Sequence, residues 1–305
     1  MSHLTPDQTQ LLMTILASIL VLVALIDTGL FVAWVIRKED ADRGLKPPLF
    51  APRWSLVDVW IGGQIILAVL MVTLVGATFV LIIFGGVTKG GIGGADRMMT
   101  SPLFLLFLMT AQNALLVVVP GIVVTQKYHV PLKAIGLPTL PSGSQIILGA
   151  VFGIALLIVS HLLDITLVWV MSNLLGPDLM KKLVEWTKAL TVAGMMEGKM
   201  TWAMYGTLLF SAGIAAPIGE EVFFRGFLYN CAKRRFGIGA GIILSAVVFA
   251  LIHGGPIAVV AIVPMGIVLA YAYEKTGSLW VPIVMHAVNN SVAVTAVFLG
   301  SKFFS

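Results

Sequence analysis

The sequence predicts an all-α fold, a polytopic membrane helix bundle of about eight transmembrane helices. Composition is the first reason: 59% of the 305 residues are apolar and 11% are charged, whereas soluble proteins average roughly a quarter charged residues. The second reason is that the apolar residues form runs of about 20 residues, the length that crosses the hydrocarbon core of a bilayer. The predicted spans are 11–36, 56–84, 102–125, 144–175, 201–232, 238–254, 256–274 and 278–300.

The first run, 11–36, is predicted to be a retained anchor rather than a cleaved signal peptide. It is longer than a typical signal-peptide core, no Lys or Arg precedes it, and no small-residue cleavage pattern follows it. Retained spans throughout predict an integral, multi-pass protein, and we expect the cell membrane as its location.

Two segments depart from simple spans. The runs 238–254 and 256–274 are short and separated by HGGP, so we expect a tight helical hairpin or partly re-entrant helices. The segment 177–190, PDLMKKLVEWTKAL, repeats its apolar residues at helical spacing and predicts an amphipathic helix on the membrane surface. The expected division is therefore 1–200, with four spans and this surface helix, and 201–305, a second membrane domain.

The charge and cysteine content exclude several classes of function. The net charge of +5 is explained by Lys and Arg beside the spans, where they face anionic lipid headgroups. No clustered basic face is visible, so we expect membrane lipids and no nucleic acid as partners. The single Cys231 excludes an internal disulfide and a zinc site with two thiolates from one chain.

The stretch GIAAPIGEEVFFRGFLYN, residues 213–230, places three charged residues inside a predicted span. A charged group at the bilayer centre costs at least about 2.5–3.5 kcal/mol and is usually paired and functional. Glu221 and Arg225 are four residues apart with the acid first, which predicts an ion pair along the helix. Glu220 lies about 100° around the helix from this pair. It therefore needs a partner from another helix, or a raised pKa.

Candidate partners for Glu220 lie in two later spans. FALIHGGP supplies His253, and WVPIVMHAVNN supplies His286 and Asn290 one turn apart on one helix face. A lone histidine in a helix is more often a packed core residue than a functional one. Helical rise, however, places Glu220, His253, His286 and Asn290 within one slab, about 12–22 Å from one membrane surface. This shared depth favours a single site.

A carboxylate, two imidazoles and an amide in one buried pocket are suited to hydrolysing an amide bond. Glu220 is the candidate base that takes a proton from water, with His253 sharing that water or passing the proton to the leaving amine. His286 and Asn290 are candidate donors to the oxyanion.

A metal site is the alternative interpretation of the same residues. Glu220, His253 and His286 would form a two-histidine, one-carboxylate zinc site with open positions for water. The sequence lacks H-E-x-x-H, so no local motif identifies a metal. We therefore expect no obligatory cofactor and keep zinc as the alternative.

Three motifs of this sequence resemble those of a known family. EEVFFR, FALIH and HAVNN resemble the E-E-x-x-x-R, F-x-x-x-H and H-x-x-x-N signatures of the type II CAAX prenyl endopeptidases. These enzymes are also called the CPBP, bacteriocin-processing or Abi family of intramembrane proteases. The resemblance covers about residues 203–295. The matching residues are Glu220, Glu221, Arg225, Phe249, His253, His286 and Asn290.

The resemblance implies an all-helical intramembrane endopeptidase acting on a membrane-associated protein or peptide, prenylated in some members. It assigns water activation to Glu220 with His253, and the oxyanion site to His286 and Asn290. Glu221, Arg225 and Phe249 would provide structural support. Many members carry a metalloprotease label, so the resemblance leaves glutamate and metal chemistry both open.

Two functions without protease activity compete with this interpretation. The first is a non-catalytic immunity or scaffolding protein of the same fold, against which the intact motifs count. The second is a transporter that uses the same polar residues as a relay. Transporters usually show repeated halves with broken helices, and we find no internal repeat.

Overall fold

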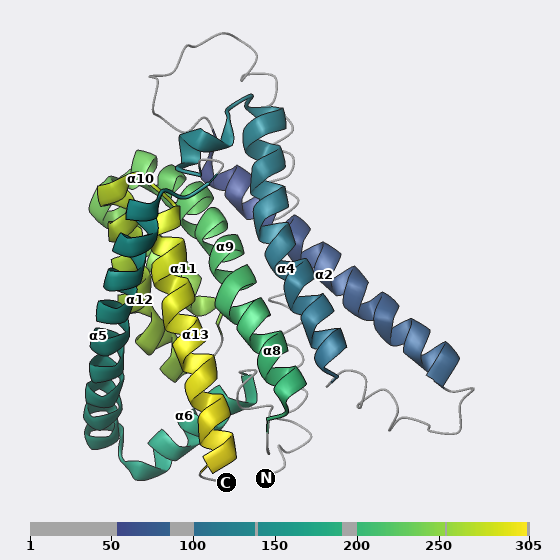
Figure 1. Cartoon of the computed structure of the whole chain (residues 1–305), viewed down its shortest axis with the longest axis vertical. Coiled ribbons are helices and arrows are strands. Elements are labelled where there is room, and N and C mark those ends of the chain that lie inside the picture. The colour runs from purple at the N-terminus through teal and green to yellow at the C-terminus, as the bar shows by residue number, and fades with distance from the viewer. Residues whose placement is uncertain (1–53, 86–100, 138–139, 191–199, 254, 304–305) are drawn as a thin grey trace, which may run out of the picture.

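The computed structural model describes residues 54–85, 101–137, 140–190, 200–253 and 255–303, and all of its elements there are helices. Figure 1 shows them as a bundle of long, roughly aligned helices. Six are long and apolar enough to cross a membrane. The predicted all-α, polytopic fold is confirmed, while the predicted span 11–36 lies outside the described residues.

The first part of the chain follows the predicted order of spans. Its helices are α2 (Leu56–Gly85), α4 (Pro102–Ile122), the π-helix η1 (Val123–Lys127), the short η2 (Leu132–Ile135), α5 (Gly143–Leu175) and α6 (Pro177–Leu190). The predicted amphipathic segment is therefore the separate helix α6. Ser142 begins α5 with a capping box, in which its side chain and that of Gln145 satisfy each other's backbone N–H groups.

A single long span lies at the centre of the bundle. Between Trp202 and Phe236 it consists of α8 (Trp202–Phe210), η3 (Ser211–Ala215), α9 (Ala216–Glu221), η4 (Val222–Tyr229) and α10 (Asn230–Phe236), where η3 and η4 are π-helices. Two thirds of its apolar window (67%) is buried, against 17–28% for the other spans. The charged residues at the middle of this span, Glu220, Glu221 and Arg225, are buried in protein.

The last three helices are α11 (Ile238–Leu251), α12 (Pro256–Thr276) and α13 (Trp280–Phe303). With 14 residues, α11 is about 21 Å long and is too short to cross a bilayer core of about 30 Å. The expected hairpin therefore has one short arm, while α12 is long enough to span.

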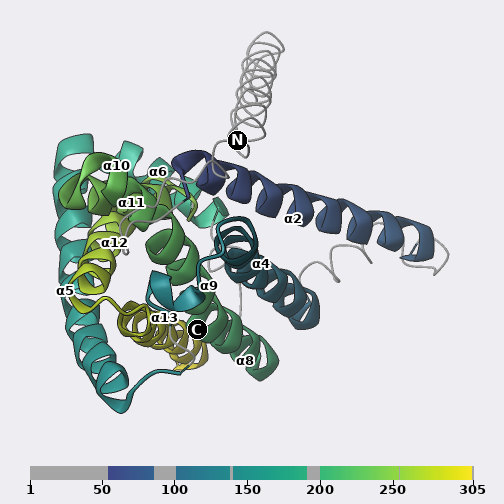
Figure 2. The same cartoon turned by 90° about the horizontal axis from the view of Figure 1, so that it is seen from above.

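Close helix contacts join the two predicted regions. α5 and α13 run side by side in both views (Figures 1 and 2). A methyl group at Gly149 or Gly153 would lie within 3 Å of Val284 or Val288, so glycine permits this approach. Figure 2 also shows α2 projecting away from the other helices.

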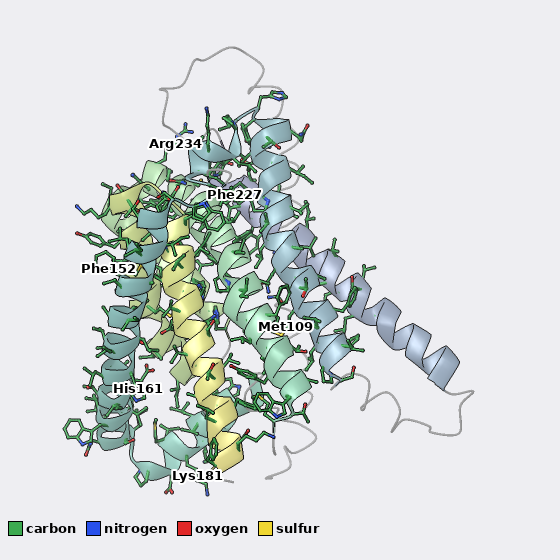
Figure 3. The ribbon with its side chains drawn as sticks, viewed as in Figure 1. Met109, Phe152, His161, Lys181, Phe227 and Arg234 are labelled. Atoms are coloured by element: carbon green, nitrogen blue, oxygen red, sulfur yellow. The ribbon has the colours of Figure 1, made fainter. Side chains whose placement is uncertain are left out.

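The division into 1–200 and 201–305 stays a prediction. Met109, labelled in Figure 3, illustrates a second contact across that boundary. Its sulfur on α4 accepts a hydrogen bond from Ser211 Oγ of η3.

Candidate active site

The predicted ion pair forms at the buried centre of the long span. Arg225 Nη1 donates to Glu221 Oε1 over 2.9 Å, and both side chains are fully buried. Arg225 also reaches two other helices: Nη2 donates to the Gly266 carbonyl at 3.1 Å, and the guanidinium lies 4.4 Å from the ring centre of Phe249. A buried charge is tolerable only when it is paired and hydrogen-bonded, and these contacts meet that requirement.

His286 of α13 joins the same pair. Its Nδ1 lies 2.9 Å from Glu221 Oε1, and its side chain is only 1% exposed. With Glu221 ionised, the carboxylate accepts and Nδ1 is the donor. The contact therefore fixes which edge of the imidazole faces away from Glu221, and that edge carries Nε2.

Glu220 lies between two imidazoles. Its Oε2 is 3.7 Å from His286 Nε2 and 3.8 Å from His253 Nε2. Both distances exceed the roughly 3.2 Å limit of a direct hydrogen bond, and Oε2 is buried without a hydrogen-bond partner. Burying a carboxylate oxygen in this way is costly. Such a group requires an explanation, and a catalytic role is one of those known.

The tautomer of His253 follows from its neighbour one turn back. His253 Nδ1 lies 2.8 Å from the Phe249 carbonyl oxygen, which can only accept, so Nδ1 carries a proton. In the neutral ring, Nε2 is then an acceptor facing Glu220. The ring of Phe249 lies 4.6 Å from that of His253 and 5.7 Å from that of His286, so it packs against Arg225 and both imidazoles.

Comparison with known proteins covers this same part of the chain. Residues 202–292 match the family model described as "Type II CAAX prenyl endopeptidase Rce1-like". We call these residues the Rce1-like segment because of this similarity. Six of the described helices are suited to crossing a membrane, and the chain is an integral, multi-pass membrane protein.

One curated relative and the solved structures complete the comparison. The Bacillus subtilis (strain 168) protein named "Putative membrane peptidase YdiL" is 26% identical over 87 residues, 28% of this chain. The matched region spans about a third (36%) of that relative's length. No solved structure matches the chain.

Asn290 is placed differently from the other three predicted site residues of the Rce1-like segment. Its Nδ2 donates to the Ala212 carbonyl at 2.9 Å, and its Oδ1 accepts a long bond from Asn289. In the described part of the chain it makes no hydrogen bond to the other three. It lies one turn from His286 and uses one of its two amide hydrogens outside the site.

The zinc alternative stays a prediction. Within the described residues, no group of three or more His, Cys, Asp or Glu side chains is arranged to hold a metal ion. Glu220 Oε2 is 3.7–3.8 Å from both Nε2 atoms, slightly more than the roughly 3.4 Å between two ligands of one tetrahedral zinc. The reaction proposed below therefore uses the side chains alone.

The Rce1-like site opens on the side of His253. The His253 side chain is 28% exposed, whereas those of Glu220 and His286 are 10% and 1% exposed. Just beyond it, Gly255 has a positive φ of 76° and lies against Thr187 of α6. The surface helix thus borders the loop that carries His253.

The sequence predicted that Glu220, His253 and His286 lie at a similar depth in the membrane. In the structure both histidines lie beside Glu220. The depth prediction missed the bond from Glu221 to His286, for which no local sequence signal exists. The link from His253 to Phe249 could have been found, because the F-x-x-x-H spacing is one helical turn.

Proposed function

We propose that this chain is an intramembrane endopeptidase that hydrolyses a peptide bond of a membrane-associated protein or peptide. The observation that carries the proposal is the environment of Glu220 Oε2, a buried and unpartnered carboxylate oxygen between two Nε2 atoms at 3.7 and 3.8 Å. The match of residues 202–292 to the Rce1-like family model supports the reaction type.

In the proposed reaction, a water molecule donates to both Glu220 and His253. Both groups are acceptors there, so together they orient the water and draw a proton from it. Glu220 takes that proton as the water oxygen bonds to the carbonyl carbon of the substrate. The proton then passes to the amide nitrogen, the C–N bond breaks, and a carboxylic acid and an amine leave.

His286 supplies the proposed oxyanion site. In the proposed reaction His286 donates to Glu221 through Nδ1 and, in its doubly protonated form, to the oxyanion through Nε2. The amide hydrogen of Asn290 that does not bond Ala212 is the second donor. Losing such a donor typically slows a reaction by about 10²–10³.

The substrate class follows from the setting of the site. Glu220 and both histidines lie within a bundle of apolar spans, so the scissile bond must be reachable from the membrane. We propose a membrane-associated polypeptide, including prenylated C-terminal CAAX peptides, and the cell membrane as the location.

The test uses the full-length chain in liposomes with two reporters, a farnesylated CAAX peptide and a single-span transmembrane peptide. We expect cleavage in H₂¹⁸O to place one ¹⁸O in the new carboxyl group. Glu220→Gln should abolish cleavage, whereas the matched variant Glu185→Gln, on the exposed surface of α6, should retain it. Cleavage that persists in Glu220→Gln would contradict the proposal.

A chelator arm separates the chemistries. Activity that survives treatment with 1,10-phenanthroline supports the metal-free reaction. Activity lost on chelation and restored by added zinc would replace it with a metal-dependent reaction. No cleavage of either reporter by the unaltered, folded chain would favour a non-catalytic immunity or scaffolding protein.

A further inference from the structure

We propose that Asn290 is a positioning residue, which holds the stretch of helix carrying Glu220 in place by satisfying a backbone carbonyl that Pro217 leaves without a partner. This inference rests on the proposed function for its activity readout and on the contacts alone for its stability readout.

The unpartnered carbonyl arises from the π-helix that precedes Glu220. In η3 the backbone hydrogen bonds run to the fifth residue, and Ala216 N–H donates to the Ser211 carbonyl. The next carbonyl in this pattern, that of Ala212, would pair with residue 217. Residue 217 is proline, which has no N–H. An unpaired carbonyl inside the membrane costs several kcal/mol unless another group satisfies it.

Asn290 supplies the missing donor from α13. Its Nδ2 lies 2.9 Å from the Ala212 carbonyl oxygen. Gly213 follows Ala212 in η3, and Ser291 follows Asn290 in α13. These two residues are also in close contact, because a methyl group at Gly213 would lie 2.6 Å from Ser291 Oγ. Glycine at 213 thus lets α13 approach η3 closely enough for the amide to reach the carbonyl.

Two contacts from one helix then fix the position of Glu220. α13 holds Ala212 through Asn290 and, one turn away, holds Glu221 through His286. Glu220 lies between these two anchor points in sequence, and its Oε2 faces His286 Nε2. Removing the first anchor frees η3 and α9 to shift along α13. A displacement of about 1 Å at a reacting group can cost roughly 10² in rate.

The experiment supplies the missing N–H by replacing Pro217. We expect Asn290→Ala to lower kcat by more than about 10²-fold, because it removes both the tether and the second oxyanion donor. KM should change little, measured well below the melting temperature. Adding Pro217→Ala supplies an N–H to the Ala212 carbonyl. The double variant should therefore recover at least about tenfold of kcat and most of the lost melting temperature. Pro217→Ala alone should remain active.

A matched control tests whether removing any helix proline has the same effect. Pro120 lies inside α4, so Pro120→Ala adds an N–H to a different helix and should not rescue Asn290→Ala. Rescue by both prolines would overturn the proposal, because the effect would then be general stabilisation.

The remaining outcomes are also decisive. If the double variant recovers its melting temperature but not its kcat, Asn290 affects the reaction only as an oxyanion donor. If it recovers neither, the bond from Asn290 to the Ala212 carbonyl has no stabilising role. Either result overturns the proposal. If the unaltered chain cleaves no reporter, the proposed function fails, and the melting temperatures of the same four variants still test the tether.

Discussion

One carboxylate oxygen, Oε1 of Glu221, lies 2.9 Å from Nδ1 of His286 and links α9 directly to α13. The same oxygen accepts the bond from Arg225, while the other oxygen, Oε2, has no partner. Glu221 therefore does more than neutralise Arg225. It orients the imidazole whose opposite nitrogen faces Glu220.

Glu221→Gln should destabilise the protein by about 3–5 kcal/mol, because it leaves the buried guanidinium of Arg225 without its counter-charge. We expect a lower melting temperature in detergent micelles. Replacing the arginine as well, in Glu221→Gln with Arg225→Met, should recover part of the loss, since the unpaired guanidinium is then gone. A double variant less stable than Glu221→Gln would contradict this account of the pair.

His253→Ala should separate activity from stability. His253 is more exposed than Glu220 and His286, so its loss should change the melting temperature little. General acid–base groups contribute typically about 10²–10⁴ to the rate, and we expect kcat on the reporter peptides to fall by that factor. Unchanged kcat in the folded variant would remove His253 from the reaction.

Gly255→Ala should displace the loop that carries His253. The new methyl group would lie 2.9 Å from Thr187 Cα and Oγ1, and φ at this position is +76°. Gly255 combines this φ with a ψ of 134°, a conformation that costs alanine roughly 1–3 kcal/mol. The added methyl group would also clash with α6. We expect lower kcat together with lower stability.

Gly237→Ala is the control for Gly255→Ala. Gly237 has a similar φ of +85°, but a methyl group added there would meet no other atom within 4 Å. The variant should lose comparable stability and keep its kcat. Equal losses of kcat in both variants would mean that backbone strain alone, without contact with α6, explains the effect.

Asp58→Asn should loosen the end of α2. The Asp58 carboxylate is 1% exposed and accepts bonds from Lys127 and from Tyr128, which follow α4, and from Ser55. An asparagine presents one acceptor oxygen fewer and no charge, so we expect a loss of about 1–3 kcal/mol in stability. Proteolysis with trypsin should report it as faster cleavage, and Asp178→Asn on α6 serves as the exposed control.

The helices themselves were predictable because hydrophobic length alone defines a span. The runs 56–84, 102–125 and 144–175 agree with α2, α4 and α5 within a few residues. The Glu221–Arg225 pair was equally accessible, because both residues lie on one helix and their spacing is a local property.

The rest of the site depends on which helices are neighbours and how each is rotated, and helical rise predicts neither. Depth in the membrane is one coordinate, and it correctly grouped Glu220 with His253 and His286. Which helices are neighbours, and how each is rotated, decide that His286 bonds Glu221 and that Asn290 bonds Ala212. The latter also depends on the π-helix at 211–215, whose register no apolar pattern reveals.

The short helix α11 also makes the proposed reaction sensitive to the surrounding lipid. A helix of about 21 Å that starts at one membrane surface would leave His253 inside a hydrocarbon layer of about 30 Å. In a thin bilayer the headgroup region would lie closer to His253, and a thick bilayer would bury the same ring deeper in acyl chains. We therefore expect the supply of water to Glu220 to depend on the acyl-chain length of the membrane in which the protein resides.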